Sequence, residues 1–294
     1  MTDTALDSQL SSLRPTRGRA ATVLLRFSRH RVGMIGALIL AAMVICAIFA
    51  PWLAPHDPTK VDYAAIIAPP SETYLLGTDE IGRDLLSRLI FGARVSVQIV
   101  AISTLLSLVF GVLIGLVSGY AGGRVDAVFM KLMDALLAFP MLVLALGIIA
   151  VLGPDLINAI IALAVVNVPG FARLTRGQVL SVRERDFVQA AKAIGASDLR
   201  VIALHVFPSV LGNIIVYASL RASSTLIAES SLAFLGLGAE PPTPTWGQML
   251  ATAMDYGEAW WMSIYPGLAI FLAALAFNFI GDGLRDSLDV KLSD

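Results

Sequence analysis

The side chains that could do chemistry in this 294-residue chain are few and widely spaced. Two ionisable residues, Arg221 and Glu229, lie within a long apolar run, where a charge is costly and must face protein, water or the membrane interface. On one helix they would lie about 12 Å apart along the axis and about 80° around it, too far for a direct pair. Two interpretations stay open. Either Arg221 pairs with a neighbouring helix or subunit and Glu229 sits near the external boundary, or both line a translocation path and meet a solute's carboxylate and ammonium groups.

The sequence contains no recognisable motif for nucleotide binding or covalent catalysis. A Gly-x-x-x-x-Gly-Lys-Ser/Thr phosphate loop is absent, so we expect this chain neither to bind nor to hydrolyse ATP. His30, His56 and His205 are too scattered to suggest a metal cluster, and no serine or cysteine nucleophile has a recognisable setting. The single cysteine, Cys46, lies in an apolar run and cannot form an internal disulfide. We therefore expect no catalytic site, no metal and no cofactor in this chain.

Composition predicts an all-α membrane protein. Hydrophobic residues make up 57% of the chain and charged residues only 15%, which is far from the balance of soluble domains. The net charge of −1 argues against a nucleic-acid partner. Apolar stretches of spanning length recur six times along the sequence, at residues 32–55, 95–119, 135–151, 156–172, 209–234 and 262–281.

The distribution of basic residues predicts the orientation of these six spans. Six arginines between residues 14 and 31 precede the first span, so residues 1–31 are expected to form a cytoplasmic tail. A cleaved signal peptide is the alternative, but this apolar run exceeds the usual length of about 7 to 15 residues. Residues 222–284 contain no lysine or arginine, as expected of a segment with an external connection, and residues 287–294 would form a second cytoplasmic tail.

Two external segments carry further patterns. In the loop of residues 56–94, prolines give way from Thr78 onward to helical spacing, which predicts an interfacial helix with Asp79 and Glu80 at its N-terminus. Near the second, proline-bound turn, Trp246, Tyr256, Trp260, Trp261 and Tyr265 cluster along the sequence. These rings are interpreted as an aromatic belt at the membrane interface, with contact to a cargo as the alternative.

A polar, basic interruption at residues 182–208 separates two spans. Its spacing predicts a short amphipathic helix over residues 186–194, with Ser181 and Glu184 as a capping box and Gly195 as the left-handed residue after its end. A second short helix would start at Ser197 and be stopped or kinked by Pro208. Alanines in the middle of the first helix would let another protein's backbone approach closely. The alternative, which composition alone favours, is an ordinary amphipathic helix lying on the membrane surface.

Several motifs resemble one transporter family. The order Gln189-Ala190-Ala191, with Gly195 six residues after the glutamine and Phe207-Pro208 beyond, resembles the Glu-Ala-Ala loop of ABC-importer permeases. Gln189 departs from that pattern by replacing the glutamate, and Phe207 stands where leucine is commoner. Residues 76–88, the proline-bound turn and residues 278–286 resemble the dipeptide, oligopeptide and nickel branch of the same family.

This resemblance implies a type I ABC-importer permease fold, with six transmembrane helices, a core domain at residues 95–286 and a cytoplasmic coupling helix. It also implies partners: a second, homologous permease, two ATPase subunits that hold ATP and Mg²⁺, an external solute-binding protein, and the lipid of a bacterial inner membrane. The cargo would be a peptide or a related small solute. The residues that the resemblance assigns to ATPase coupling are Asp186, Phe187, Gln189, Ala190, Ala191, Lys192 and Gly195.

Two other classes of protein remain as alternatives. A secondary transporter driven by an ion gradient would show internal repeats and coupling-ion carboxylates near the bilayer midplane, and no clear inverted repeat is visible. A membrane scaffold without transport activity is the third possibility. The sequence does not identify the cargo.

Overall fold

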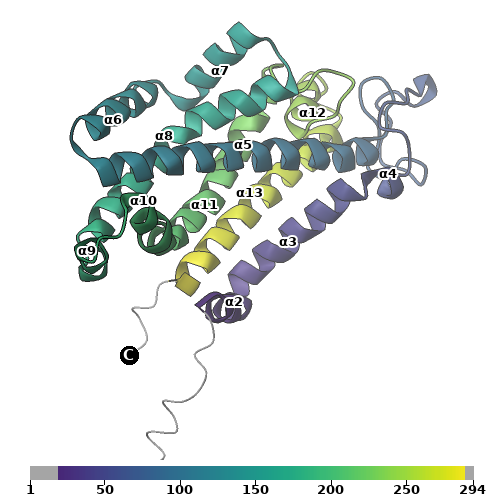
Figure 1. Cartoon of the computed structure of the whole chain (residues 1–294). Coiled ribbons are helices and arrows are strands. Elements are labelled where there is room, and N and C mark those ends of the chain that lie inside the picture. The colour runs from purple at the N-terminus through teal and green to yellow at the C-terminus, as the bar shows by residue number, and fades with distance from the viewer. Residues whose placement is uncertain (1–18, 289–294) are drawn as a thin grey trace, which may run out of the picture.

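The computed structural model describes residues 19–288, and these form a bundle of long apolar helices (Figure 1). Five helical segments are long and apolar enough to cross a membrane, and a bent pair of helices makes a sixth candidate. The five are α3 (Arg31–Ile48), α5 (Leu85–Ala121), α8 (Leu156–Arg183), the run Asp198–Phe234 that ends in α11 (Phe207–Phe234), and α13 (Trp260–Leu288). The all-α membrane fold predicted from composition is confirmed.

The bent pair corrects the third predicted span, which was expected to be continuous over residues 135–151. Instead α6 (Gly123–Leu137) and α7 (Met141–Leu152) meet at an angle of 91°. Pro140 lies at the break, where its ring disfavours helical backbone in the preceding residue and its nitrogen offers no hydrogen-bond donor.

Shorter elements connect the long helices. Most of them lie at the two ends of the bundle: α2 (Arg19–Arg29), α4 (Ala50–Leu53), the 3₁₀ turn η1 (Tyr63–Ala65), α9 (Asp186–Ala193), α10 (Asp198–Val201), the π-helical turn η2 (Ile202–Val206) and α12 (Trp246–Ala253). The expected N-terminal tail thus contains helix α2 from residue 19 on. Residues 1–18 and 289–294 of the two expected tails lie outside the described part of the chain.

The long helix α5 runs the length of the molecule and packs along α8 (Figure 1). Three glycines on one face of α5, Gly111, Gly115 and Gly119, make close approach possible. A Cβ atom at Gly115 would lie 2.6 Å from the carbonyl oxygen of Ala172, which is inside van der Waals contact. This repeat of small residues at every fourth position brings the two helix backbones together.

On the other side of the bundle, α3 lies along α13, which also packs on α11 (Figure 1). Gly33 of α3 faces Gly283 of α13 closely enough that a Cβ atom at Gly33 would be 3.1 Å from the Cα atom of Gly283. His30 precedes α3, accepts a hydrogen bond from the Gly33 N–H through Nδ1, and lies 3.1 Å from the Asp286 carboxylate through Nε2. The elbow between α2 and α3 is therefore fixed to the end of α13.

The predicted interfacial helix that starts at Thr78 is wrong. Helix α5 begins at Leu85 and continues without a break into the second span. Asp84 caps it by accepting a hydrogen bond from the Ser87 N–H, and this cap decides where the helix starts. Asp79 instead folds back in a tight turn, where it accepts hydrogen bonds from the N–H groups of Ile81 and Arg83.

Two predicted helix boundaries in the polar interruption also change. Helix α8 extends through Ser181 to Arg183, so the Ser181–Glu184 capping box is wrong and Arg185 precedes α9 without a side-chain cap. Pro208 neither stops nor separates a helix, because the chain passes from α10 through the π-helical turn η2 into α11. Pro208 lies in the first turn of α11, where a missing N–H is tolerated best.

Candidate functional site

The polar interruption folds as a compact projection between α8 and α11, which we call the α9 segment (residues 184–206). Helix α9 ends at Ala193, and Gly195, two residues later, has a φ of +83°, the left-handed conformation expected from the sequence. The Gly195 N–H donates to the Lys192 carbonyl over 2.9 Å, and the Ala196 N–H donates to that of Ala191 over 3.1 Å. These bonds close the helix C-terminus and turn the chain sharply toward α10.

An apolar seat holds the α9 segment against the bundle. Val188 and Ala191 are buried beneath α9, and Val201 and Val206 are buried beneath the turns that follow. They belong to one cluster with apolar side chains of α5 and α8, namely Val112, Leu116, Phe171, Val179 and Val182. The α9 segment therefore rests on the α5–α8 pair.

The opposite face of the segment exposes apolar side chains. Phe187 is exposed, and Ile194 has 86% of its surface open. Leu199 and Leu204 extend this exposed apolar group beyond α9. Six of the seven predicted coupling residues are exposed and so available to another protein, whereas Ala191 is buried in the seat: the six are Asp186, Phe187, Gln189, Ala190, Lys192 and Gly195.

Gln189 has a contact that a glutamate could not make. Its side-chain amide donates a hydrogen bond to the Arg183 carbonyl over 3.0 Å. A carboxylate at this position would have no proton to donate and would face the carbonyl oxygen. The glutamine therefore serves here to tie α9 to the end of α8.

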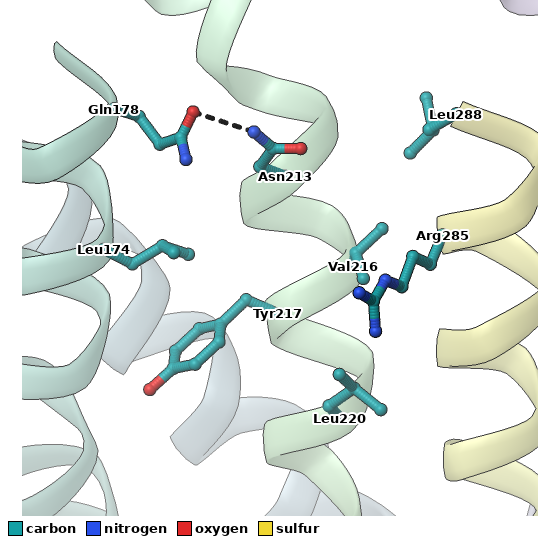
Figure 2. A pocket seen from close by; sticks show the side chains of 8 residues that line it. All are labelled: Leu174, Gln178, Asn213, Val216, Tyr217, Leu220, Arg285 and Leu288. Atoms are coloured by element: carbon teal, nitrogen blue, oxygen red, sulfur yellow. Dashed lines mark hydrogen bonds between the residues drawn. The ribbon is translucent and has the colours of Figure 1, made fainter. Parts of the chain in front are cut away.

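A polar cavity opens beside α8, α11 and α13 (Figure 2). It has a volume of about 360 Å³ and is lined by Leu174, Gln178, Asn213, Val216, Tyr217, Leu220, Arg285 and Leu288. The Asn213 amide donates to the Gln178 side-chain oxygen over 2.8 Å across the cavity. Arg285 points from α13 toward α11, as Figure 2 shows.

Arg221 lies at the edge of this cavity, one helical turn after Tyr217 on α11. Its Nε donates to the Tyr217 hydroxyl over 2.6 Å, and its guanidinium carbon is 5.0 Å from the centre of the Tyr217 ring. Tyr217 itself lines the cavity, so the arginine is joined to the cavity wall through this ring. No ion pair of Arg221 with an acid occurs within residues 19–288.

Glu229 lies farther along α11 and does not contact Arg221. Only 2% of its surface is exposed, and its Oε2 accepts hydrogen bonds from the hydroxyls of Ser96, over 3.3 Å, and Ser230, over 3.2 Å. Its Oε1 is buried without a hydrogen-bond partner in the described part of the chain. The structure therefore places the two predicted path residues apart, Arg221 beside the cavity and Glu229 within the packed bundle.

Sequence reasoning did not identify the cavity residues Gln178, Asn213, Tyr217 and Arg285. Gln178 and Arg285 lie beyond the ends of the predicted spans. Asn213 and Tyr217 lie within the predicted fifth span and gave a signal, because polar side chains in an apolar run are candidates for an internal polar surface. That Asn213 and Tyr217 face one cavity together with side chains of α8 and α13 follows only from how the helices pack.

The predicted aromatic belt is wrong for two of its members. Trp246 and Trp261 are buried, and their indole N–H groups donate to the carbonyls of Leu89 and Thr78 over 3.0 and 3.1 Å. Trp246 therefore fixes α12 to α5, and Trp261 fixes α13 to the loop before α5. Trp260 is exposed, and its position in such a belt stays a prediction.

The helical bundle, the polar cavity and the projecting α9 segment define a membrane permease. Residues 111–294 match the family of binding-protein-dependent transport system inner membrane components, and residues 19–70 match the N-terminal TM domain of oligopeptide transport permease C. The chain belongs to this family of ABC-importer permease subunits, which excludes the secondary transporter.

Relatives of similar length match nearly the whole chain. The Di/tripeptide transport system permease protein DppC of Pseudomonas aeruginosa is 48% identical over 273 residues, which cover 90% of each chain. The Probable D,D-dipeptide transport system permease protein DdpC of Escherichia coli is 41% identical over 290 residues, 97% of each chain. The Glutathione transport system permease protein GsiD of Escherichia coli is 42% identical over 269 residues, 91% of this chain and 89% of the relative.

Proposed function

We propose that this chain forms one half of the pore of an ATP-driven importer for short peptides. A second, homologous permease would form the other half, two ATPase subunits would hold ATP and Mg²⁺, and an external binding protein would deliver the cargo. The observation that carries this proposal is the α9 segment, which presents Phe187 and Ile194 outward while Val188 and Ala191 seat it on α5 and α8. Exposed apolar side chains on a well-seated projection suit a stable protein contact.

The cargo class rests on the relatives and on the cavity. The relatives are named for di/tripeptides, D,D-dipeptides and glutathione, and all of these carry both ammonium and carboxylate groups. The cavity offers amide and hydroxyl groups from Gln178, Asn213 and Tyr217, together with the Arg285 guanidinium. Such a surface can replace part of the hydration of a peptide's polar groups without binding it tightly.

The orientation rests on where basic residues gather. Helices α2 and α9 and the end of α13 lie at the same end of the bundle (Figure 1). Among the described residues, the elements at that end carry the basic residues Arg26, Arg29, Arg31, Arg183, Arg185, Lys192 and Arg200. On the positive-inside rule, we propose that this end faces the cytoplasm of a bacterial cell and that the loop before α5 lies outside.

In the proposed mechanism the α9 segment receives the force. ATP-driven closure of the two ATPase subunits displaces it, and the α5–α8 pair beneath it turns with it. The paired permeases then alternate between inward and outward access of the path between them. This chain makes no covalent intermediate and supplies shape, polar lining and a coupling surface.

Arg221 and Glu229 take different parts in this proposal. Arg221, joined to the cavity wall through Tyr217, is the group that meets a peptide's carboxylate. Glu229 meets the ammonium group only in a conformation that separates α11 from α5 and so breaks its contact with Ser96. We expect Arg221→Gln to change the ratio of uptake between peptides with and without a free carboxylate. If both Arg221→Gln and Glu229→Gln show the substrate preference of the wild type, these roles are refuted.

The function is tested by uptake of labelled dipeptide into proteoliposomes that contain the complete complex. We expect uptake to require ATP and the binding protein, and to persist when the proton gradient is collapsed. The purified chain alone should carry nothing. Uptake by this chain alone, or uptake that stops when the gradient collapses in the presence of ATP, would contradict the proposal.

A further inference from the structure

The last turn of α5 reaches the α9 segment through one side chain, Tyr120. Its hydroxyl donates to the Asp198 carboxylate of α10 over 2.7 Å. Its ring lies under the Lys192 ammonium of α9, with 4.7 Å between Nζ and the ring centre. One tyrosine on a membrane-crossing helix therefore contacts both short helices of the α9 segment.

The end of α5 that carries Tyr120 is itself firmly held. The Arg183 guanidinium at the end of α8 donates to the Gly119 carbonyl over 3.0 Å. Asp126 of α6 accepts two hydrogen bonds from Arg176 of α8, over 3.0 and 2.6 Å, and a third from the Ser118 hydroxyl. Tyr120 thus stands on a junction where α5, α6 and α8 are bonded to one another.

The apolar seat beneath α9 does not provide the same kind of attachment. Contacts of Val188, Ala191 and Val201 resist separation from the bundle, but hydrophobic contacts have no preferred direction and permit sliding. A hydrogen bond is directional and a cation over a ring has a preferred position. Within the described part of the chain, the other side-chain hydrogen bond of α9 runs from Gln189 to the Arg183 carbonyl, six residues earlier, and does not involve α10.

We propose that Tyr120 is a positioning residue that locks α9 and α10 to the end of α5, so that a displacement of the α9 segment moves α5 with it. Helix α5 has 37 residues and runs to the loop at the other end of the molecule, where Gly92 packs on Trp246. The lock therefore joins the coupling surface to both ends of the bundle. This inference rests on the proposed coupling function of α9.

The test measures peptide transported per ATP hydrolysed by the complete complex in proteoliposomes. Tyr120→Phe removes only the hydroxyl, and we expect it to lower this ratio roughly three- to tenfold, as the loss of one typical, solvent-exposed hydrogen bond implies. Asp198→Ala should lower it similarly, whereas Asp198→Asn retains an acceptor oxygen and should stay near the wild type. The double variant Tyr120→Phe with Asp198→Ala should be no worse than either single variant, because both remove the same bond.

Two further variants test whether the effect is specific to the Tyr120 hydroxyl. Tyr63→Phe removes a hydroxyl from an exposed tyrosine in the loop before α5 and should leave the ratio unchanged. Lys192→Met removes the cation but keeps the stem over the ring, and should lower the ratio less than Tyr120→Phe.

An unchanged ratio in Tyr120→Phe, or additive losses in the double variant, would overturn the lock while leaving the importer intact. Wild-type uptake that is independent of ATP would overturn the proposed function and the lock together.

Discussion

The two ends of this molecule are stabilised in different ways. At one end, the loop of residues 54–84 and helix α12 cover the bundle with buried polar contacts. Asp79 is only 3% exposed and pairs with Arg83 over 2.6 Å and with Arg88 over 3.2 Å. Trp246 and Trp261 add indole hydrogen bonds to backbone carbonyls.

At the other end, the α9 segment leaves its charged residues exposed and depends on an apolar seat and a few surface bonds. A region that only maintains its own shape can enclose charges, because each has a fixed partner. A region that a second protein must contact and move keeps its polar and apolar groups accessible. This difference between the ends supports the proposed coupling role of the α9 segment.

The largest expected effect tests the buried charges of the loop. Asp79→Asn should destabilise the protein by roughly 3–5 kcal/mol, because it leaves a buried arginine without its counter-charge. Arg88 is 4% exposed, and neither an asparagine oxygen at residue 79 nor the Pro58 carbonyl, 3.3 Å away, supplies a negative charge. Thermal unfolding in detergent measures the change. Asp57→Asn, at an exposed carboxylate of the same loop, is the control, and equal stability of the two variants would contradict the comparison.

The next effect tests the helix pair beneath the α9 segment. Gly115→Ala should cost about 1–3 kcal/mol of stability, because the new Cβ atom would lie 2.6 Å from the Ala172 carbonyl and force α5 and α8 apart. Gly147→Ala is the matched control, since no atom lies within 4 Å of its Cβ position. The stability of both variants is measured by thermal unfolding in detergent. A tolerated Gly115→Ala would mean that the two helices separate at little cost.

A smaller effect on stability, with a large effect on function, is expected at the α9 segment. Ile194→Ser should change the free energy of unfolding by no more than about 0.5 kcal/mol, since the side chain is exposed. It should nevertheless weaken association with the ATPase subunits, which co-purification and ATP-dependent uptake measure. Leu75→Ser is the control, an exposed apolar residue of the loop that should leave ATPase association intact. Equal association of the two variants with the ATPase subunits would contradict the proposed functional difference between the ends.

The smallest effect concerns pH and the loop. The Tyr74 hydroxyl donates to Asp62 over 2.8 Å, which lowers the pKa of Asp62 and raises the pKa of Tyr74. The Asp62 contribution to stability is therefore present above the ordinary aspartate pKa and is lost as pH falls through the lowered value. The Tyr74 contribution is present below the ordinary tyrosine pKa and is lost as pH rises through the raised value.

Tyr74→Phe should remove the alkaline dependence and reduce the acidic one, because Asp62 still accepts a hydrogen bond from the Ala64 N–H. Limited proteolysis of the loop at acidic and alkaline pH measures both. An unaltered pH profile in the variant would show that this bond is not maintained in solution.

Sequence reasoning succeeded where a pattern is local. The apolar runs predicted the membrane-crossing helices, and Gly195 predicted the left-handed end of α9, because both depend on residues a few positions apart. It failed at Thr78, where helical spacing was present but Asp84 supplied the cap that starts α5. It also failed at Pro140, where a long apolar run concealed a bend of 91°.

The sequence by itself determined the class of fold, the number and approximate positions of the apolar segments, and the polar interruption with its family resemblance. Only the tertiary structure decided that Trp246 and Trp261 are buried, that Glu229 lies against Ser96, and that Tyr120 contacts α9 and α10. Ser96 and Glu229 are separated by 133 positions in the chain. Helical periodicity specifies which face a residue occupies, but which other helix covers that face depends on how all the helices pack together.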